Sequence, residues 1–191
     1  MRHETTSQNT KKMILDTFVE LLELKPISKI TVSEIVNKCQ INRKTFYYHF
    51  TDIYDLLEWF LNDRIQETLD DFDLVDDFEQ IISVAKKYID TTPCLAHCAD
   101  DPIGSEKLVY YLTQKLQPLL LEVIHHFEIQ NNKQLDESYK LFISELFSKS
   151  SALHLVDVLR EKSPIDYTQY STYISITLHS ALEGILIKMG H

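Results

Sequence analysis

The sequence has few of the residues that form turns and cross-links: three glycines, five prolines and three cysteines among 191 residues. So little turn chemistry argues against sheets and favours long helices. The cysteines are odd in number, and Cys39 falls on the apolar face of a predicted helix. A disulfide framework is therefore not expected.

Long apolar runs are also lacking. No stretch of about 18 apolar residues could span a bilayer, and the polar start, Met-Arg-His-Glu-Thr-Thr-Ser, does not fit a signal peptide. A hydrophobic content of 44% and a charged content of 25% are typical of a globular protein of one or two domains. We therefore expect a cytoplasmic protein with no membrane partner.

Negative charge dominates the chain, but it is unevenly distributed. The net charge is −10; residues 1–50 carry 8 Lys and Arg against 5 Asp and Glu, a net +3, whereas residues 51–191 carry 11 against 24, a net −13. A surface that binds DNA phosphates needs local positive charge, and an acidic remainder repels the duplex. The division predicts that contact with double-stranded DNA lies in the first 50 residues.

The end of this basic segment has the pattern of two short helices joined by a tight turn. Thr31 and Glu34 fit a capping box that opens the first helix, and Asn42 can cap the second. Phe46 and Phe50, four residues apart, share one side of the second helix, which we expect to be buried. The other positions carry donors that phosphates and base edges accept. This arrangement predicts a helix-turn-helix motif whose second helix enters the major groove.

The runs Thr31-Val32-Ser33-Glu34-Ile35 and Thr45-Phe46-Tyr47-Tyr48-His49-Phe50 resemble the DNA-binding end of TetR/AcrR-type bacterial transcriptional regulators. By this resemblance, the base edges would be contacted by Arg43, Lys44 and Thr45. The phosphates would be contacted by Thr31, Ser33, Tyr47 and His49. Tyr48, whose hydroxyl lies on the same polar side of the helix, completes the predicted DNA-binding set.

Two positions depart from the pattern of that family. The turn usually has Gly where this chain has Gln40, so the left-handed backbone expected there costs energy. A Lys commonly begins the next helix, where this chain has Ile53, which removes one side chain that could contact a phosphate.

Apolar spacing along the whole chain predicts an all-α fold of about nine helices. We expect a three-helix helix-turn-helix DNA-binding domain over residues 1–51 and a larger helical domain for effector binding and dimerisation over residues 52–191. The last two long helices carry more apolar surface than one face needs. This surplus predicts a homodimer built as a four-helix bundle, unless it covers other helices of the same chain.

The resemblance also implies an effector cavity in the second domain, beside a helix predicted from about Glu106 to Phe127. The candidate lining residues are Tyr88, His97, Tyr110 and Tyr111, although tyrosines serve equally well as core residues. The stretch Thr-Phe-Tyr-Tyr-His-Phe-Thr-Asp-Ile-Tyr-Asp-Leu-Leu and the acid-rich second domain resemble the DhaS-like branch of the family. Members of that branch activate transcription by binding a kinase-like co-regulator protein, so the effector is either a small molecule or a protein.

Other site chemistry has weaker support in the sequence. Cys94, His97 and Cys98 could supply three zinc ligands, with His125 or His126 as the fourth, but small thiols packed in a core give the same spacing. The acidic run at residues 70–77 lacks the Gly and the terminal Glu of a calcium-binding EF-hand loop. We therefore expect neither a metal nor a cofactor.

An enzyme is the remaining alternative class. Several histidines could act in catalysis: His97, His125, His126, His154 and His179. No nucleophile elbow, Gly-rich phosphate loop or paired metal motif accompanies them. The sequence thus predicts a regulator with no catalytic residues.

Overall fold

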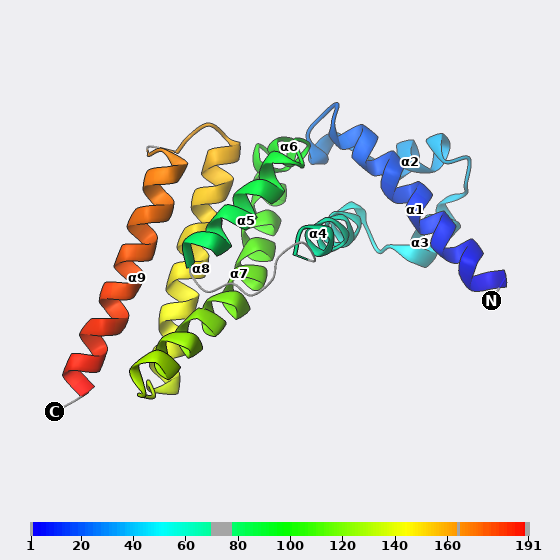
Figure 1. The fold of residues 1–191 in the computed structure, drawn as a ribbon. Coiled ribbons are helices and arrows are strands. Elements are labelled where there is room, and N and C mark those ends of the chain that lie inside the picture. The colour runs from blue at the N-terminus through cyan, green and yellow to red at the C-terminus, as the bar shows by residue number, and fades with distance from the viewer. Residues whose placement is uncertain (1, 70–77, 164, 190–191) are drawn as a thin grey trace. The chain divides into compact units, whose positions relative to one another are not determined.

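The computed structural model describes residues 2–69, 78–163 and 165–189, and the acidic run at residues 70–77 lies outside them. Nine α-helices and one short 3-10 helix, with no strand, make up the described part (Figure 1). The predicted all-α fold is confirmed. The elements are α1 (Arg2–Leu22), η1 (Ile27–Lys29), α2 (Val32–Lys38), α3 (Arg43–His49), α4 (Ile53–Leu69), α5 (Phe78–Asp90), α6 (Leu95–Ala99), α7 (Pro102–Asn131), α8 (Glu137–Leu159) and α9 (Tyr167–Met189).

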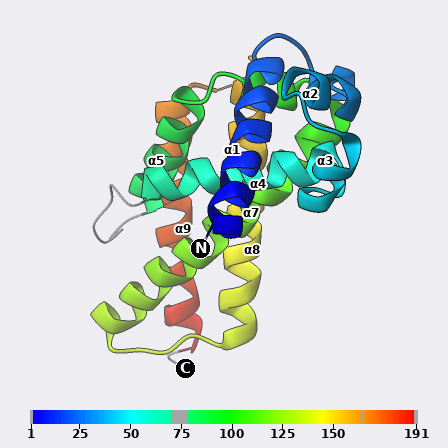
Figure 2. The ribbon, with the colours of Figure 1, turned by 90° about the vertical axis from the view of Figure 1, so that its right-hand side faces the viewer.

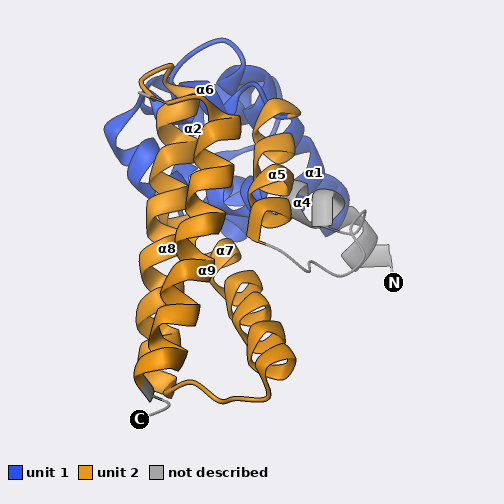
Figure 3. Ribbon diagram, turned by 60° about the vertical axis from the view of Figure 1, so that its left-hand side comes forward, with its two compact units in different colours: residues 1–67, 92–108 blue, residues 68–91, 109–191 orange. Residues whose placement is uncertain are grey.

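None of the helices in the described ranges combines the length and the apolar character needed to cross a bilayer. The chain instead forms two compact units, shown in different colours in Figure 3. Unit 1 contains Met1–Glu67 and Thr92–Leu108, and unit 2 contains Thr68–Thr91 and Val109–His191. The boundary predicted at residue 51 is a functional one, between DNA binding and effector binding. It stays a prediction, because the two units are defined by compactness alone.

In unit 1, α1 packs on α2 and α2 packs on α3 (Figure 2). The core that joins them consists of apolar side chains at helical spacing, each at most 4% exposed. Its residues are Phe18, Leu22, Ile35, Val36, Phe46 and Phe50. Burial of side chains of this size stabilises the bundle by about 1.5–3 kcal/mol each.

The turn between α2 and α3 has the geometry that its sequence predicts. Gln40 has a φ of 53°, in the left-handed region. The N–H of Ile41 donates to the carbonyl of Val36 at 3.0 Å, and the N–H of Gln40 donates to the carbonyl of Asn37 at 3.2 Å. These two hydrogen bonds form a Schellman motif, which satisfies the last carbonyls of α2 and usually has glycine at the left-handed position. Gln40 adopts this conformation despite its Cβ.

Unit 1 also includes α6 and the first residues of α7. His97 Nδ1 lies 2.6 Å from the carbonyl oxygen of Leu22 at the end of α1. Asp101 is buried and accepts a hydrogen bond from the N–H of Gly104 at 2.8 Å, so it caps α7. A Cβ on Gly104 would lie 2.6 Å from the carbonyl oxygen of Cys98, which explains the glycine. The helix predicted to begin near residue 106 therefore begins earlier, at Pro102.

In unit 2, α5 packs against both α8 and α9, and α8 and α9 pack against each other. The rings of Phe78 and Phe147 meet edge to face at 6.1 Å between centroids. The predicted long C-terminal helices are both present, and α7 continues through Pro118.

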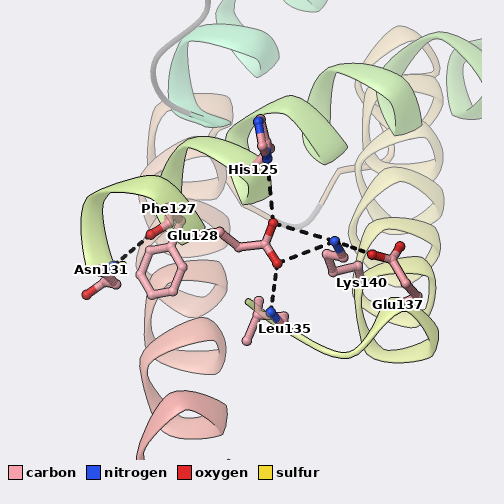
Figure 4. Close-up of polar contacts among 7 residues, drawn as sticks. All are labelled: His125, Phe127, Glu128, Asn131, Leu135, Glu137 and Lys140. Carbon is pink, nitrogen blue, oxygen red and sulfur yellow. Dashed lines mark hydrogen bonds and ion pairs between the residues drawn. The ribbon is translucent and has the colours of Figure 1, made fainter. Parts of the chain in front are cut away.

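A buried carboxylate joins α7 to α8 (Figure 4). Glu128 is 6% exposed; its Oε1 accepts the backbone N–H of Leu135 at 2.7 Å and lies 3.3 Å from Lys140 Nζ. His125 Nδ1 lies 3.6 Å from the other carboxylate oxygen. Burial alone would raise the pKa of Glu128, but the Leu135 N–H and the Lys140 cation outweigh it, and the pKa lies below its ordinary value.

Replacing Gln40 with glycine should stabilise the protein. The substitution removes the steric cost of a Cβ at positive φ, so we expect the free energy of unfolding to rise by about 0.5–1 kcal/mol in urea denaturation. Asn37→Gly is the matched control, because Asn37 lies within α2 and is exposed. There glycine should lower stability by about 0.5–1 kcal/mol. A loss of stability in both variants would contradict the left-handed assignment.

Replacing Glu128 with glutamine should lower stability at neutral pH by about 1–3 kcal/mol, because Lys140 loses its buried partner. Since folding lowers the pKa of Glu128, its contribution is complete above the unfolded value of about 4.3 and is lost as the pH falls through the folded value. Unfolding curves of the two proteins should therefore converge in acid. Glu137→Gln, at an exposed partner of Lys140, should change stability by less than about 1 kcal/mol.

Candidate nucleic-acid interface

Helix α3 has one buried and one exposed face. Phe46 and Phe50 are 0% and 2% exposed, whereas Tyr47 and Tyr48 are 55% and 79% exposed. The rings of Tyr47 and Phe46 meet edge to face at 5.5 Å between centroids, which orients the exposed Tyr47 side chain. Arg43 is exposed at the first position of the helix. The core-facing phenylalanines thus turn the polar side chains of α3 outward.

Caps fix the start of each of the two short helices. The N–H of Thr45 donates to Asn42 Oδ1 at 2.8 Å, and the N–H of Glu34 donates to Thr31 Oγ1 at 3.3 Å. Both predicted caps are present. The Thr31 hydroxyl accepts in this bond and keeps its own proton, which can be donated to a phosphate oxygen.

Arg43 and Ser33 lie together. The guanidinium of Arg43 donates a hydrogen bond through Nη2 to Ser33 Oγ, so α2 and α3 present one continuous polar surface. This contact occupies one of the five guanidinium donors and leaves the others available to an acceptor. The structure thereby joins two residues that the sequence placed on separate helices.

His49 is half-buried at the end of α3, with its ring 4.9 Å from that of Tyr48. Burial, and then the positive charge of Lys11, lower the pKa of His49. The imidazole is therefore mainly neutral at pH 7 and offers a ring N–H as a donor. Lys11 belongs to α1, so this charge reaches the end of α3 from another helix.

The four residues predicted to line an effector cavity differ in their surroundings. Tyr88 and Tyr111 are buried and Tyr110 is 63% exposed; all three belong to unit 2. His97 belongs to unit 1, where its ring contacts the Leu22 carbonyl. The effector cavity therefore stays a prediction.

Several of the residues considered for metals and catalysis make packing contacts. Within the described ranges, no group of three or more His, Cys, Asp or Glu side chains is arranged to hold a metal ion. Cys94 and Cys98 are buried thiols, and burial raises the pKa of Cys98. The ring of His154 stacks on Tyr170 at 3.6 Å between centroids, inside unit 2.

The capped pair α2 and α3, joined by a Schellman turn and supported by α1, defines a helix-turn-helix DNA-binding domain. A model of the bacterial regulatory proteins of the tetR family matches residues 14–59, which include the whole motif. Residues 14–59 are thus a DNA-binding domain of the TetR type, and the chain is similar to the DNA-binding transcriptional regulators of that family.

Known proteins resemble the chain beyond this motif. It is 26% identical over 175 residues to the HTH-type dhaKLM operon transcriptional activator DhaS of Lactococcus lactis subsp. lactis (strain IL1403), covering 92% of this chain and 81% of that protein. A solved structure of the dihydroxyacetone kinase operon activator DhaS matches with a TM-score of 0.64 and 19% identity, covering 91% of this chain and 96% of that one. The TetR family repressor AlkX from Dietzia sp. strain DQ12-45-1b matches with a TM-score of 0.54 and 15% identity, covering 90% and 97%.

Proposed function

We propose that the protein binds a near-palindromic operator as a homodimer and places one α3 in each of two successive major grooves. The observation that carries this proposal is the exposure of Arg43, Lys44, Tyr47 and Tyr48 on the side of α3 opposite its buried phenylalanines. A protein that binds the bacterial chromosome in this way acts in the cytoplasm.

Different residues of the motif have different tasks in this proposal. Arg43, Lys44 and Thr45, at the start of α3, contact base edges, where an arginine recognises guanine through two hydrogen bonds. Thr31, Ser33, Tyr47 and His49 donate to phosphates and fix the position of α3 on the duplex, with Tyr48 exposed beside them.

Exposed apolar side chains support the homodimer. Helices α8 and α9 carry a set of large apolar residues that are each at least half exposed within one chain. They are Leu141, Phe142, Leu146, Leu153, Tyr173, Ile176 and Ile187. Phe142, Leu146 and Leu153 recur at helical spacing and line a hollow on α8. Surfaces of this kind mark interfaces, and a second copy would cover both helices in a four-helix bundle.

The helices of the second domain bind the controlling effector in this proposal, either a small molecule or a co-regulator protein. Similarity to an operon activator over most of the chain supports activation of transcription. Control by a co-regulator is what the resemblance to the DhaS-like branch implies. Tyr88, Tyr111, Tyr110 and His97 remain the proposed contacts with a small ligand.

Selection of random duplexes by the purified protein, followed by sequencing, tests this function directly. We expect sites with two-fold symmetry and half-sites about 10 base pairs apart, the repeat of the major groove. The proposal would be disproved if the selection recovered no preferred sequence. It would also be disproved if a variant with alanine at Arg43, Tyr47 and His49 together kept its affinity for the selected duplex.

Arg43→Ala and Tyr47→Phe should affect binding differently. Loss of the guanidinium should reduce discrimination at one base position in each half-site by about 1–3 kcal/mol, because only base contacts carry sequence information. Loss of the Tyr47 hydroxyl should weaken all duplexes alike. Fluorescence anisotropy with the selected duplex and with single-base variants measures both effects. Equal loss on every duplex with Arg43→Ala would refute its role as a base contact.

Leu146→Glu should dissociate the dimer. Two buried, unpaired carboxylates at the interface should weaken association by about 3 kcal/mol or more, roughly 150-fold, in analytical ultracentrifugation. Leu24→Glu is the control, because Leu24 is 74% exposed outside α8 and α9. That variant should associate like the wild type. A Leu146→Glu protein that stayed dimeric would place the interface elsewhere.

A further inference from the structure

Lys11 on α1 is held in place by two aromatic rings. Its Nζ lies 5.9 Å from the ring centroid of Phe50, which follows α3, and 5.8 Å from that of Trp59 on α4. A lysine on a helix surface normally samples many rotamers, whereas each cation–π contact stabilises this position by about 0.5–1 kcal/mol. The ammonium is therefore fixed at the junction of three helices of unit 1.

The same ammonium lies close enough to His49 to influence it. Lys11 is the charged group that, after burial, lowers the pKa of His49. The ring of His49 lies 6.4 Å from that of Phe50, the ring over which Lys11 is placed. A cation and a neutral imidazole donor thus come from different helices to one end of α3.

The two carboxylates that follow His49 in the sequence, Asp52 and Asp55, are engaged with the backbone. Asp52 Oδ1 accepts the N–H groups of Tyr54 at 2.7 Å and Asp55 at 2.8 Å, and Asp55 Oδ2 accepts the N–H of Thr51 at 2.7 Å. These carboxylates cap the start of α4. Within the described ranges, no carboxylate forms an ion pair with Lys11, so its charge is available for an external anion.

Lys12, the next residue, has different surroundings. It lines a hollow between α1 and α4 together with Asp16, Glu20 and Asp63. The carboxylates in this hollow repel phosphate. The two lysines are therefore distinct: one adjoins α3, and the other adjoins an acidic surface.

We propose that Lys11 and His49 together bind one phosphate of the DNA backbone, at the C-terminal end of each recognition helix. This inference rests on the proposed binding of an operator by a dimer. Lys11 supplies the charge, and His49 supplies an N–H donor. The α1 helix thereby contacts the duplex directly, in addition to supporting α2 and α3.

The dependence of affinity on salt tests the inference, with the selected duplex as the probe. Removing one phosphate contact from each protomer should lower the slope of log K against log[salt] by about 1.8 for the dimer. Between 50 and 200 mM salt, the wild type should thus lose about twelve-fold more affinity than Lys11→Gln. Lys11→Arg keeps the charge and should keep the slope. Lys12→Gln removes the same charge from the neighbouring residue and should also keep it.

Circular dichroism reports on folding in these variants, because Trp59, the single tryptophan of the chain, itself contacts Lys11. An unchanged helical signal and a cooperative thermal transition in Lys11→Gln would show that a changed slope does not arise from misfolding. If Lys11→Gln unfolds, Lys11→Met is used in its place, because methionine keeps an apolar stem over the two rings. The phosphate site is overturned if a folded Lys11 variant that lacks the charge has the salt slope of the wild type. It is also overturned if Lys12→Gln lowers the slope as much as Lys11→Gln does. Wild-type protein that fails to select any duplex would instead refute the proposed function.

Discussion

The burial of two phenylalanines on one side of α3 is the constraint on which the DNA-binding surface depends. This helix has seven residues, and isolated helices shorter than about 12–15 residues are marginal in water. Phe46 and Phe50 are almost fully buried and Asn42 caps the first turn, so packing and capping replace the hydrogen bonds that a longer helix would provide. The same contacts determine which side chains face outward. The exposure of Arg43 and Tyr47 is thus a consequence of the core.

Features that depend on a few neighbouring residues could be predicted from the sequence. The caps at Thr31 and Asn42, the shared face of Phe46 and Phe50, and the left-handed backbone at Gln40 all agree with the structure. Each follows from spacing along a helix or from hydrogen bonds that span at most a few residues. The Gln40 position is informative because its residue type argued against the conformation, yet the surrounding turn imposed it.

Features that depend on contacts between distant segments could not be predicted. The helix expected from about Glu106 begins at Pro102 and includes Gly104, where a Cβ would meet the Cys98 carbonyl and the side chain of Ile27. Proline is favourable at the first position of a helix, so Pro102 was itself a signal for the helix start. Lys11 has no local pattern that distinguishes it from its neighbour. Only the folded positions of Phe50 and Trp59 separate the two lysines.

The contact between Arg43 and Ser33 has a consequence for base recognition in the proposed complex. Ordering an arginine side chain on binding costs about 0.5–1.5 kcal/mol, and part of this cost is already met when the guanidinium is hydrogen-bonded in the free protein. Because the guanidinium has five donors, one bond to Ser33 leaves enough of them for a bidentate contact with guanine. Helix α2 would then influence sequence preference through the orientation of Arg43, although its own residues are assigned to phosphates. The two helices would act as one recognition surface.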